Sequence, residues 1–324
     1  MPLSKISPAS PPPFQILHLG YVERFTTNLE RARDFYVEHF GLQISAEDER
    51  HLYLRAMQER RHHSLLVSQG SGGEVGAIGF RLAAEEDLDR AMEWFSRRGL
   101  RGAWIERPWT GRRVLRVVDP WGVPLEFYSL ITAMPPLHHR YRLYHGARPL
   151  RLDRIALRHP DVEEAMAFYA AIGFAPAEIV REEPAARLRA VLADLPGAPA
   201  VLTLLQGSGP GLHHLAYRVS DPAHVIDFLD LLSSTGHASM IEHGPGRHGL
   251  SNAFYLYILD ADRHRTGLCC GDSRAAQAEG APIEWAGQDP RWQRLWGAPP
   301  PASWEETAAP FAAIPRPPRG LKRD

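Results

Sequence analysis

The side chains that could do chemistry in this chain are mostly histidines, which bind metals and move protons near neutral pH. The 324 residues include 16 histidines, and several stand in adjacent pairs. The pairs His62-His63 and His138-His139 have a spacing typical of metal ligands, but neighbouring arginines and a loop setting favour surface histidines. His213, which precedes His214, and His264 are interpreted as structural residues.

The composition excludes several kinds of site. The only two cysteines are Cys269 and Cys270, which excludes a disulfide framework and a cysteine-rich zinc module. The net charge of −1 gives no reason to expect a nucleic-acid or membrane partner. The first residues lack the apolar core of a signal peptide, and no later stretch reaches about 18 apolar residues. We therefore expect a soluble, cytoplasmic protein of about two domains, at roughly 150 residues each.

An internal repeat predicts that two similar modules position these side chains. Three segments recur at offsets of 133, 137 and 141 residues: DFYVEHFGL (34–42) as AFYAAIGF (167–174), AIGFRL (77–82) as HLAYRV (214–219), and VVDPWGVPLEFY (117–128) as YILDADRHRTGLC (257–269). A drift this small indicates a duplication.

Each copy has the same predicted elements, in a βαβββ order. A strand is followed by a helix that ends at a glycine, and three alternating stretches follow with a second helix among them. The strands are Ile16–Glu23 and Leu152–Leu157, the first helices Leu29–Phe40 and Val162–Ile172, the glycines Gly41 and Gly173, and the second helices Glu85–Arg98 and Pro222–Thr235.

These patterns divide the chain into six parts. They are a proline-rich tail (1–14), an N-terminal domain (15–131), a linker (132–150), a C-terminal domain (151–273), an appendage (274–298) and a proline-rich basic tail (299–324). The appendage carries Trp285, Trp292 and Trp296, which we interpret as a packed lid or an oligomer contact.

Four segments carry a resemblance to a known family. The most specific is HGPGRHGLSNAFYLYILD (243–260), supported by HLYLRAMQERRHHSLLVSQG (51–70), GLHHLAYRV (211–219) and RYRLYHG (140–146). From about Phe14 to Trp304 the chain resembles the type I extradiol ring-cleaving dioxygenases of the vicinal oxygen chelate superfamily, in particular the homoprotocatechuate class. The resemblance implies an α+β fold of two tandem domains, each a pair of βαβββ modules, that encloses a barrel-like pocket.

The resemblance also implies an activity. Members of the family bind ferrous iron in the C-terminal domain through two histidines and one glutamate, and open positions on the iron accept a catecholic acid and O₂. They are homotetrameric enzymes that act in the breakdown of aromatic compounds. The N-terminal domain has the same fold without iron.

Two of the three iron ligands are replaced in this chain. His214 matches the central ligand, whereas Arg154 stands at the position of the first and Gly267 at the position of the third. The repeat supports this alignment, because it pairs Asp119 with Asp260 and therefore places Glu126 opposite Gly267. In the N-terminal domain, Tyr21 and Ala77 stand at the other two positions, so Glu126 has no partner ligands.

Other family residues are partly retained. His248 and Tyr257, which face the substrate and O₂ pocket in the family, are present. The family's acid–base histidine is expected near Ala200, its substrate-binding arginines at His243 and near Gln293, and all three are replaced. We assign catalytic positions to His248 and Tyr257, pocket positions to His243 and Arg154, and the retained ligand to His214.

Three interpretations of this incomplete metal site remain open. The chain is a dioxygenase by descent, with poor or no iron binding and little ring cleavage. Alternatively, it is a non-catalytic binding or assembly protein for an aromatic acid, with the Arg154 guanidinium replacing the charge of the metal. A third reading is an enzyme without metal or with a relocated metal, for example zinc on His214 and Cys269 with His213 or His243. Otherwise Cys269 and Cys270 are small buried hydrophobes, and Arg154 pairs with a local carboxylate or the pocket has collapsed.

Overall fold

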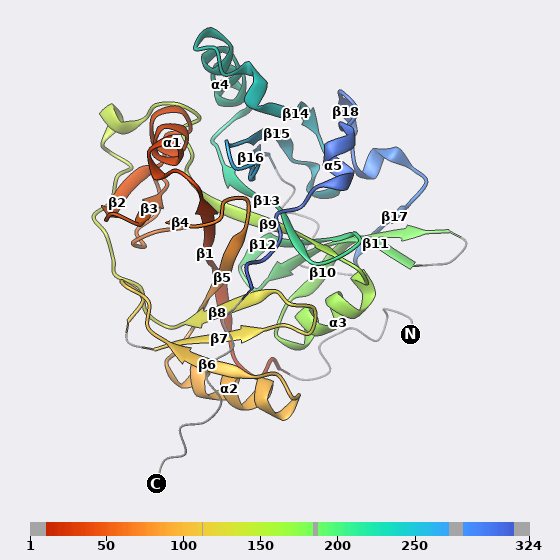
Figure 1. Ribbon diagram of the computed structural model, residues 1–324. Coiled ribbons are helices and arrows are strands. Elements are labelled where there is room, and N and C mark those ends of the chain that lie inside the picture. The colour runs from red at the N-terminus through yellow and green to blue at the C-terminus, as the bar shows by residue number, and fades with distance from the viewer. Residues whose placement is uncertain (1–10, 112, 184–186, 272–280, 314–324) are drawn as a thin grey trace.

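Two mixed β-sheets, each belonging to one domain, form the body of the molecule (Figure 1). The computed structural model describes residues 11–111, 113–183, 187–271 and 281–313. The N-terminal sheet has the strand order β2-β3-β4-β1-β5-β8-β7-β6, and the C-terminal sheet has the order β17-β10-β11-β12-β9-β13-β16-β15-β14-β18. No helix of the described residues is long and apolar enough to cross a membrane.

Each sheet is built from two βαβββ units that meet at their first strands. In the N-terminal domain the units are β1 (Ile16–Thr26), α1 (Leu29–Arg33), β2 (Gln43–Glu47), β3 (His51–Arg55) and β4 (Leu65–Gln69), then β5 (Val75–Leu82), α2 (Glu86–Arg97), β6 (Gly102–Ile105), β7 (Val114–Val118) and β8 (Pro124–Tyr128). β1 pairs with β5 in antiparallel orientation. The α+β fold with paired βαβββ modules that the resemblance implies is therefore confirmed, whereas the single βαβββ unit predicted for each copy is wrong, because the second helix of each copy belongs to a second unit.

The C-terminal domain repeats this plan and adds an edge strand on each side. Its units are β9 (Arg151–His159), α3 (Val162–Ala171), β10 (Ala175–Glu182), β11 (Arg187–Leu195) and β12 (Ala198–Gln206), then β13 (Gly211–Arg218), α4 (Pro222–Ser234), β14 (Ile241–Arg247), β15 (Phe254–Leu259) and β16 (Arg265–Cys270). The appendage supplies the edge strands β17 (Ile283–Ala286) and β18 (Trp296–Gly297). Its Trp292 is buried, whereas Trp296 is about half exposed.

Local sequence explains where the helices begin and end. Asp161 and Asp221 cap α3 and α4 by accepting hydrogen bonds from backbone N–H groups of the first turn. Gly41 and Gly173 follow the first helix of each domain and have φ values of +90° and +109°, which favour glycine. The helix predicted over residues 29–40 differs in one respect, because its second half, Asp34–His39, is a π-helix.

The two domains contact each other through two equivalent tyrosine–aspartate hydrogen bonds. The Tyr36 hydroxyl, on the first helix of the N-terminal domain, donates to Asp260 Oδ2 of the C-terminal domain at 2.7 Å. In return, the Tyr169 hydroxyl on α3 donates to Asp119 Oδ2 of the N-terminal domain at 3.4 Å. The two aspartates also make the same local turn, in which Oδ1 accepts from the N–H groups two and four residues ahead. The repeat pairing of Asp119 with Asp260 is therefore present in the structure.

Two expectations from the sequence are wrong. Residues 299–313 are not a tail: α5 (Ala302–Glu306) carries Trp304, which is 5% exposed, and the following residues bridge to Leu212 and Val75. Burial of the indole among aromatic side chains outweighs the proline-rich composition. His62 and His63 are buried rather than at the surface, because the neighbouring Arg61 donates to the Leu19 and Gly20 carbonyls while the imidazoles pack on aromatic rings.

Candidate functional site

The positions of Arg154 and Gly267 lie on opposite sides of β13. Ala216 of β13 is in register with Arg154 of β9 on one side and with Gly267 of β16 on the other. His214 lies two residues before Ala216 on the same strand. The three ligand positions expected from the resemblance are therefore neighbours in the sheet.

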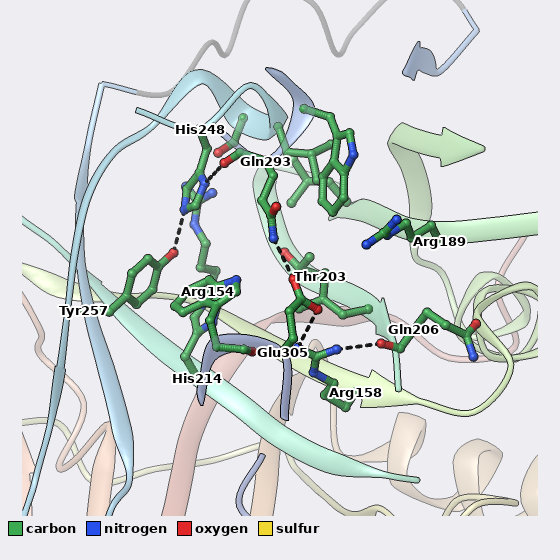
Figure 2. A pocket seen from close by; sticks show the side chains of 16 residues that line it. Arg154, Arg158, Arg189, Thr203, Gln206, His214, His248, Tyr257, Gln293 and Glu305 are labelled. Carbon is green, nitrogen blue, oxygen red and sulfur yellow. Dashed lines mark hydrogen bonds and ion pairs between the residues drawn. The ribbon is translucent and has the colours of Figure 1, made fainter. Parts of the chain in front are cut away.

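A cavity opens beside them (Figure 2). Its volume is about 80 Å³, whereas a single water needs about 10–15 Å³. The residues that line it are Arg154, Arg158, Arg189, Leu192, Thr203, Leu205, Gln206, His214, His248, Leu250, Ser251, Tyr257, Trp292, Gln293, Trp304 and Glu305. The pocket has therefore not collapsed.

Most of the predicted site residues meet in this cavity. Figure 2 shows Arg154, His214, His248 and Tyr257 gathered at one side of it. His243 is not among the lining residues: it is buried behind them, with Nε2 3.0 Å from the Tyr255 hydroxyl and its ring against Trp304. The side chain of Ala200 lies outside the part of the chain that the structure describes.

Arg154 pairs with a carboxylate on its own strand. Its Nε and Nη2 each lie 2.9 Å from Asp153 Oδ2, and Arg218 Nε donates to Asp153 Oδ1 at 2.8 Å. Burial opposes ionisation of Asp153, but the two guanidinium groups outweigh it and lower its pKa to about 2. The expectation of a local carboxylate partner for Arg154 is confirmed, and the side chain still forms part of the cavity wall.

A chain of hydrogen bonds fixes the protonation of His214. His213 Nε2 lies 2.8 Å from the Trp304 carbonyl, to which it can only donate, so His213 Nδ1 is an acceptor. His214 Nδ1 lies 2.7 Å from that atom and therefore donates to it. Burial, with Arg265 nearby, holds the pKa of His214 well below its usual value, so its Nε2 carries a lone pair at neutral pH.

His248 and Tyr257 form a second pair with a defined direction. His248 Nδ1 donates to the Gln293 carbonyl at 2.6 Å, so its Nε2 accepts from the Tyr257 hydroxyl at 2.9 Å. Burial lowers the pKa of His248 to about 3 and raises the pKa of Tyr257 above its usual value. Both groups are therefore neutral at pH 7, and the Tyr257 hydroxyl donates its hydrogen bond to His248 Nε2.

The ring of Tyr257 covers the space that a side chain at position 267 would need. A Cβ placed on Gly267 would lie 2.8 Å from Tyr257 Cε1 and 3.1 Å from Ala216 Cβ. The glutamate expected there by resemblance therefore does not fit the present arrangement of Tyr257.

Opposite His214 the cavity is lined by cationic groups. Arg158 donates to the Gln206 and Trp304 carbonyls at 2.7 Å and lies 3.3 Å from Glu305. Arg189 reaches toward the cavity from β11 (Figure 2), and its side chain is 40% exposed. Arg154 is paired with Asp153 and Arg158 with Glu305, whereas Arg189 lies 3.9 Å from the exposed Glu182, so Arg189 is the guanidinium best placed to meet an anionic ligand.

The residues present do not fit a family iron site. His214 can donate one nitrogen lone pair, but Arg154 is a permanent cation and Gly267 has no side chain. Among the described residues, no group of three histidine, cysteine or acidic side chains meets at this cavity. The structure thus offers one of the three expected ligands.

The alternative zinc set is not assembled either. Cys269 does not line the cavity, and its Sγ contacts Asp153 Oδ2 and the Tyr217 carbonyl at 3.5 and 3.6 Å. Burial raises the pKa of this thiol, which disfavours the thiolate that binds metals. The interpretation of Cys269 and Cys270 as small buried side chains is confirmed.

Several cavity residues were missed by sequence reasoning. Trp304 and Glu305 belong to a segment that its prolines marked as a tail, although a tryptophan beside glutamates was a sign of a packed helix. Arg158 and Arg189 come from strands whose alternation predicts the fold but does not say which face borders a cavity.

The N-terminal domain fills the corresponding place with charge pairs. Tyr21, Gly79 and Glu126 are in register on β1, β5 and β8, as Arg154, Ala216 and Gly267 are in the other sheet. Glu126 is fully buried, accepts hydrogen bonds from Arg107, Arg116 and the Tyr21 hydroxyl, and shares Arg107 with Glu23. Burial alone would raise the pKa of Glu126, but these arginines lower it.

Comparison with known proteins agrees with this fold and site. Residues 18–127 and 151–268 match the Glyoxalase/Bleomycin resistance protein/Dioxygenase superfamily. Each matched segment covers one of the two domains, and together they span more than half of the chain. The protein therefore belongs to this superfamily.

Within the superfamily, its relatives are extradiol dioxygenases. The structure of homoprotocatechuate 2,3-dioxygenase from Brevibacterium fuscum, in complex with 3,4-dihydroxyphenylacetate, is 33% identical, covers 94% of this chain and 96% of that chain, and has a TM-score of 0.87. The enzyme of the same name from Arthrobacter globiformis is 32% identical, covers 94% and 95%, and has a TM-score of 0.88. A manganese-dependent 2,3-dihydroxybiphenyl 1,2-dioxygenase from Geobacillus genomosp. 3 is 26% identical over 301 residues, 88% of this chain and 95% of that protein. The expected relationship is confirmed.

Proposed function

We propose that this chain is an extradiol dioxygenase homologue that binds a small hydroxylated aromatic acid without metal and does not cleave its ring. One observation carries the proposal. The cavity is open and lined by ordered polar groups, yet two of the three expected ligand positions hold a paired arginine and a glycine. Of the three readings of the sequence, this geometry favours the non-catalytic binding protein.

Each end of such a ligand has a complementary group. The lone pair of His214 Nε2 suits a phenolic hydroxyl donor, because a neutral imidazole accepts at one nitrogen. Trp292 and Trp304 offer apolar surface for the ring. Arg189, on the opposite side, suits the carboxylate, which it can bind through two parallel hydrogen bonds. Protein side chains, rather than a metal ion, would therefore select the aromatic ligand.

A binding experiment tests the proposal. The untagged protein is treated with EDTA, and 3,4-dihydroxyphenylacetate is titrated by calorimetry without oxygen and again after ferrous iron and O₂ are supplied. We expect binding that EDTA does not abolish and no coloured ring-opened product. Absence of binding after EDTA treatment, or rapid product formation with iron, would contradict the proposal.

A matched pair of variants locates the ligand. Arg189→Gln removes the guanidinium at the cavity and is expected to weaken binding about tenfold, the effect of one lost charge-assisted hydrogen bond. Arg187→Gln changes the same residue type two positions earlier on β11, where the side chain is exposed and does not line the cavity. Equal affinities in the two variants would place the ligand elsewhere.

A further inference from the structure

A group of metal-binding side chains lies outside the cavity, where the two domains meet. Asp34 and His39 belong to the π-helix that follows α1, and His237 follows α4 of the other domain. One possible ligand atom from each lies within 4.8 Å of the other two. The imidazole centroids of His39 and His237 are 4.1 Å apart. Two histidines and one carboxylate are a donor set that zinc prefers.

The π-helix is what brings Asp34 and His39 together. In this form of helix the hydrogen bonds join residues five positions apart, so such residues lie on the same face. Asp34 and His39 are five apart, and His39 Nδ1 donates to the Asp34 carbonyl at 3.1 Å. In an α-helix, neighbours on one face are three or four positions apart, and this pair would diverge.

Both histidines are held so that one nitrogen is left for a ligand. Because His39 Nδ1 donates to a carbonyl, its Nε2 carries the lone pair. His237 Nδ1 lies 3.1 Å from Thr235 Oγ1, and the Thr235 hydroxyl donates its own hydrogen bond to the Leu231 carbonyl. His237 Nδ1 therefore donates, and its Nε2 is the nitrogen left for a ligand. Hydrogen bonds from the second ring nitrogen orient histidines in metal sites in this way.

The surroundings also suit a divalent cation. The Asp34 side chain is 60% exposed and that of His39 is 14% exposed, so the carboxylate can adjust while the imidazole is held. The nearby Arg33 is directed to Glu38 and Glu47, at 3.7 and 3.6 Å, and its charge is offset there. Phe40 and Phe228, whose centroids lie 6.1 Å apart, pack the π-helix segment against α4, and Figure 1 shows α1 near α4.

We propose that Asp34, His39 and His237 form a zinc-binding site that joins the two domains, with water completing the coordination. A metal at this place would add a link between the domains beside the Tyr36–Asp260 contact. Because ligand binding to the folded state alone raises stability, the melting temperature should rise with zinc concentration. The site is independent of the aromatic ligand proposed for the cavity.

Zinc titration of the untagged, EDTA-treated protein tests this site. We expect one zinc ion per chain, with affinity reduced at least about tenfold in His39→Ala and in His237→Ala, since even loss of an orienting group costs that much. His51→Ala is the matched control, because His51 forms an exposed pair with Asp48 at 2.9 Å but belongs to no three-residue group among the described residues. His214→Ala controls for binding in the cavity.

Two readouts decide the outcome. The zinc-dependent rise in melting temperature should disappear in His237→Ala and persist in His51→Ala and His214→Ala. Absence of zinc binding by the unmodified chain, or undiminished affinity in His237→Ala, would overturn the site. Loss of binding in His214→Ala alone would move the metal to the cavity and would contradict both proposals. Melting curves without zinc show whether each variant is folded.

Discussion

Three matching strand positions carry different side chains in the two domains: Tyr21, Gly79 and Glu126 in the N-terminal domain, and Arg154, Ala216 and Gly267 in the C-terminal domain. In the first set a buried carboxylate is neutralised by arginines and by a tyrosine. In the second set the carboxylate is absent, a tyrosine ring has taken its place, and a cavity remains beside it. The comparison teaches that one backbone register supports either a filled, charge-paired interior or an open pocket.

The largest expected effect comes from breaking the filled interior. Glu126→Gln removes the carboxylate that pairs with Arg116 and one of the two that pair with Arg107, and breaking a buried charge pair costs about 3–5 kcal/mol of folding free energy. Urea denaturation measures this cost. Glu305→Gln at the cavity is the control, because Glu305 is 48% exposed and its pairing is worth at most about 1 kcal/mol. Equal stability of the two variants would break the comparison.

Acid should weaken the C-terminal domain through His248. Unfolded histidine titrates near 6.5, whereas burial lowers the pKa of folded His248 to about 3. Between these values the unfolded state binds more protons, so stability falls as the pH drops below about 6.5, by about 2 kcal/mol at pH 5 for this one group. Urea midpoints from pH 7 to pH 5 test the sign. His248→Asn should reduce the slope by up to one proton, and an unchanged slope would exclude His248 as the source.

Filling the glycine position should also destabilise the open domain. Gly267→Ala places a Cβ 2.8 Å from the Tyr257 ring, and overpacking of this kind costs about 1–3 kcal/mol. Gly209→Ala is the control, since nothing lies within 4 Å of its added Cβ. If both variants were as stable as the unmodified chain, the Tyr257 ring would move aside at little cost. Arg154→His with Gly267→Glu would then be a realistic route to an iron site.

The smallest effect is expected at the cavity wall. Tyr257→Phe removes the hydrogen bond to His248 Nε2, for which about 1 kcal/mol is typical. The cost stays small because water in the cavity can donate to the acceptor that loses its tyrosine partner. A loss as large as that of Glu126→Gln would mean that water does not reach this acceptor, and the contrast between a filled and an open interior would be weaker than proposed.

The sequence was sufficient to predict the framework but not the lining of the cavity. Periodicity and glycine caps located the helices of both copies, and the repeat paired Glu126 with Gly267, because these features depend on residues close in sequence or on the duplication. Trp304 was misplaced because the surrounding prolines indicated a tail, while its burial depends on aromatic side chains from distant strands. His62 was misjudged because Arg61, the reason for a surface assignment, turns to backbone carbonyls instead.

The exchanged tyrosine–aspartate contacts have a consequence for how the chain arose. Tyr36 contacts Asp260 as Tyr169 contacts Asp119, so each half offers the other the surface that it receives. Reciprocity of this kind is the property of an isologous interface between identical subunits. Fusion of two copies of one gene therefore required no new contact surface between the halves. The fusion made the association of the two halves intramolecular, at a high effective concentration. One half could then change its side chains while the other kept its shape.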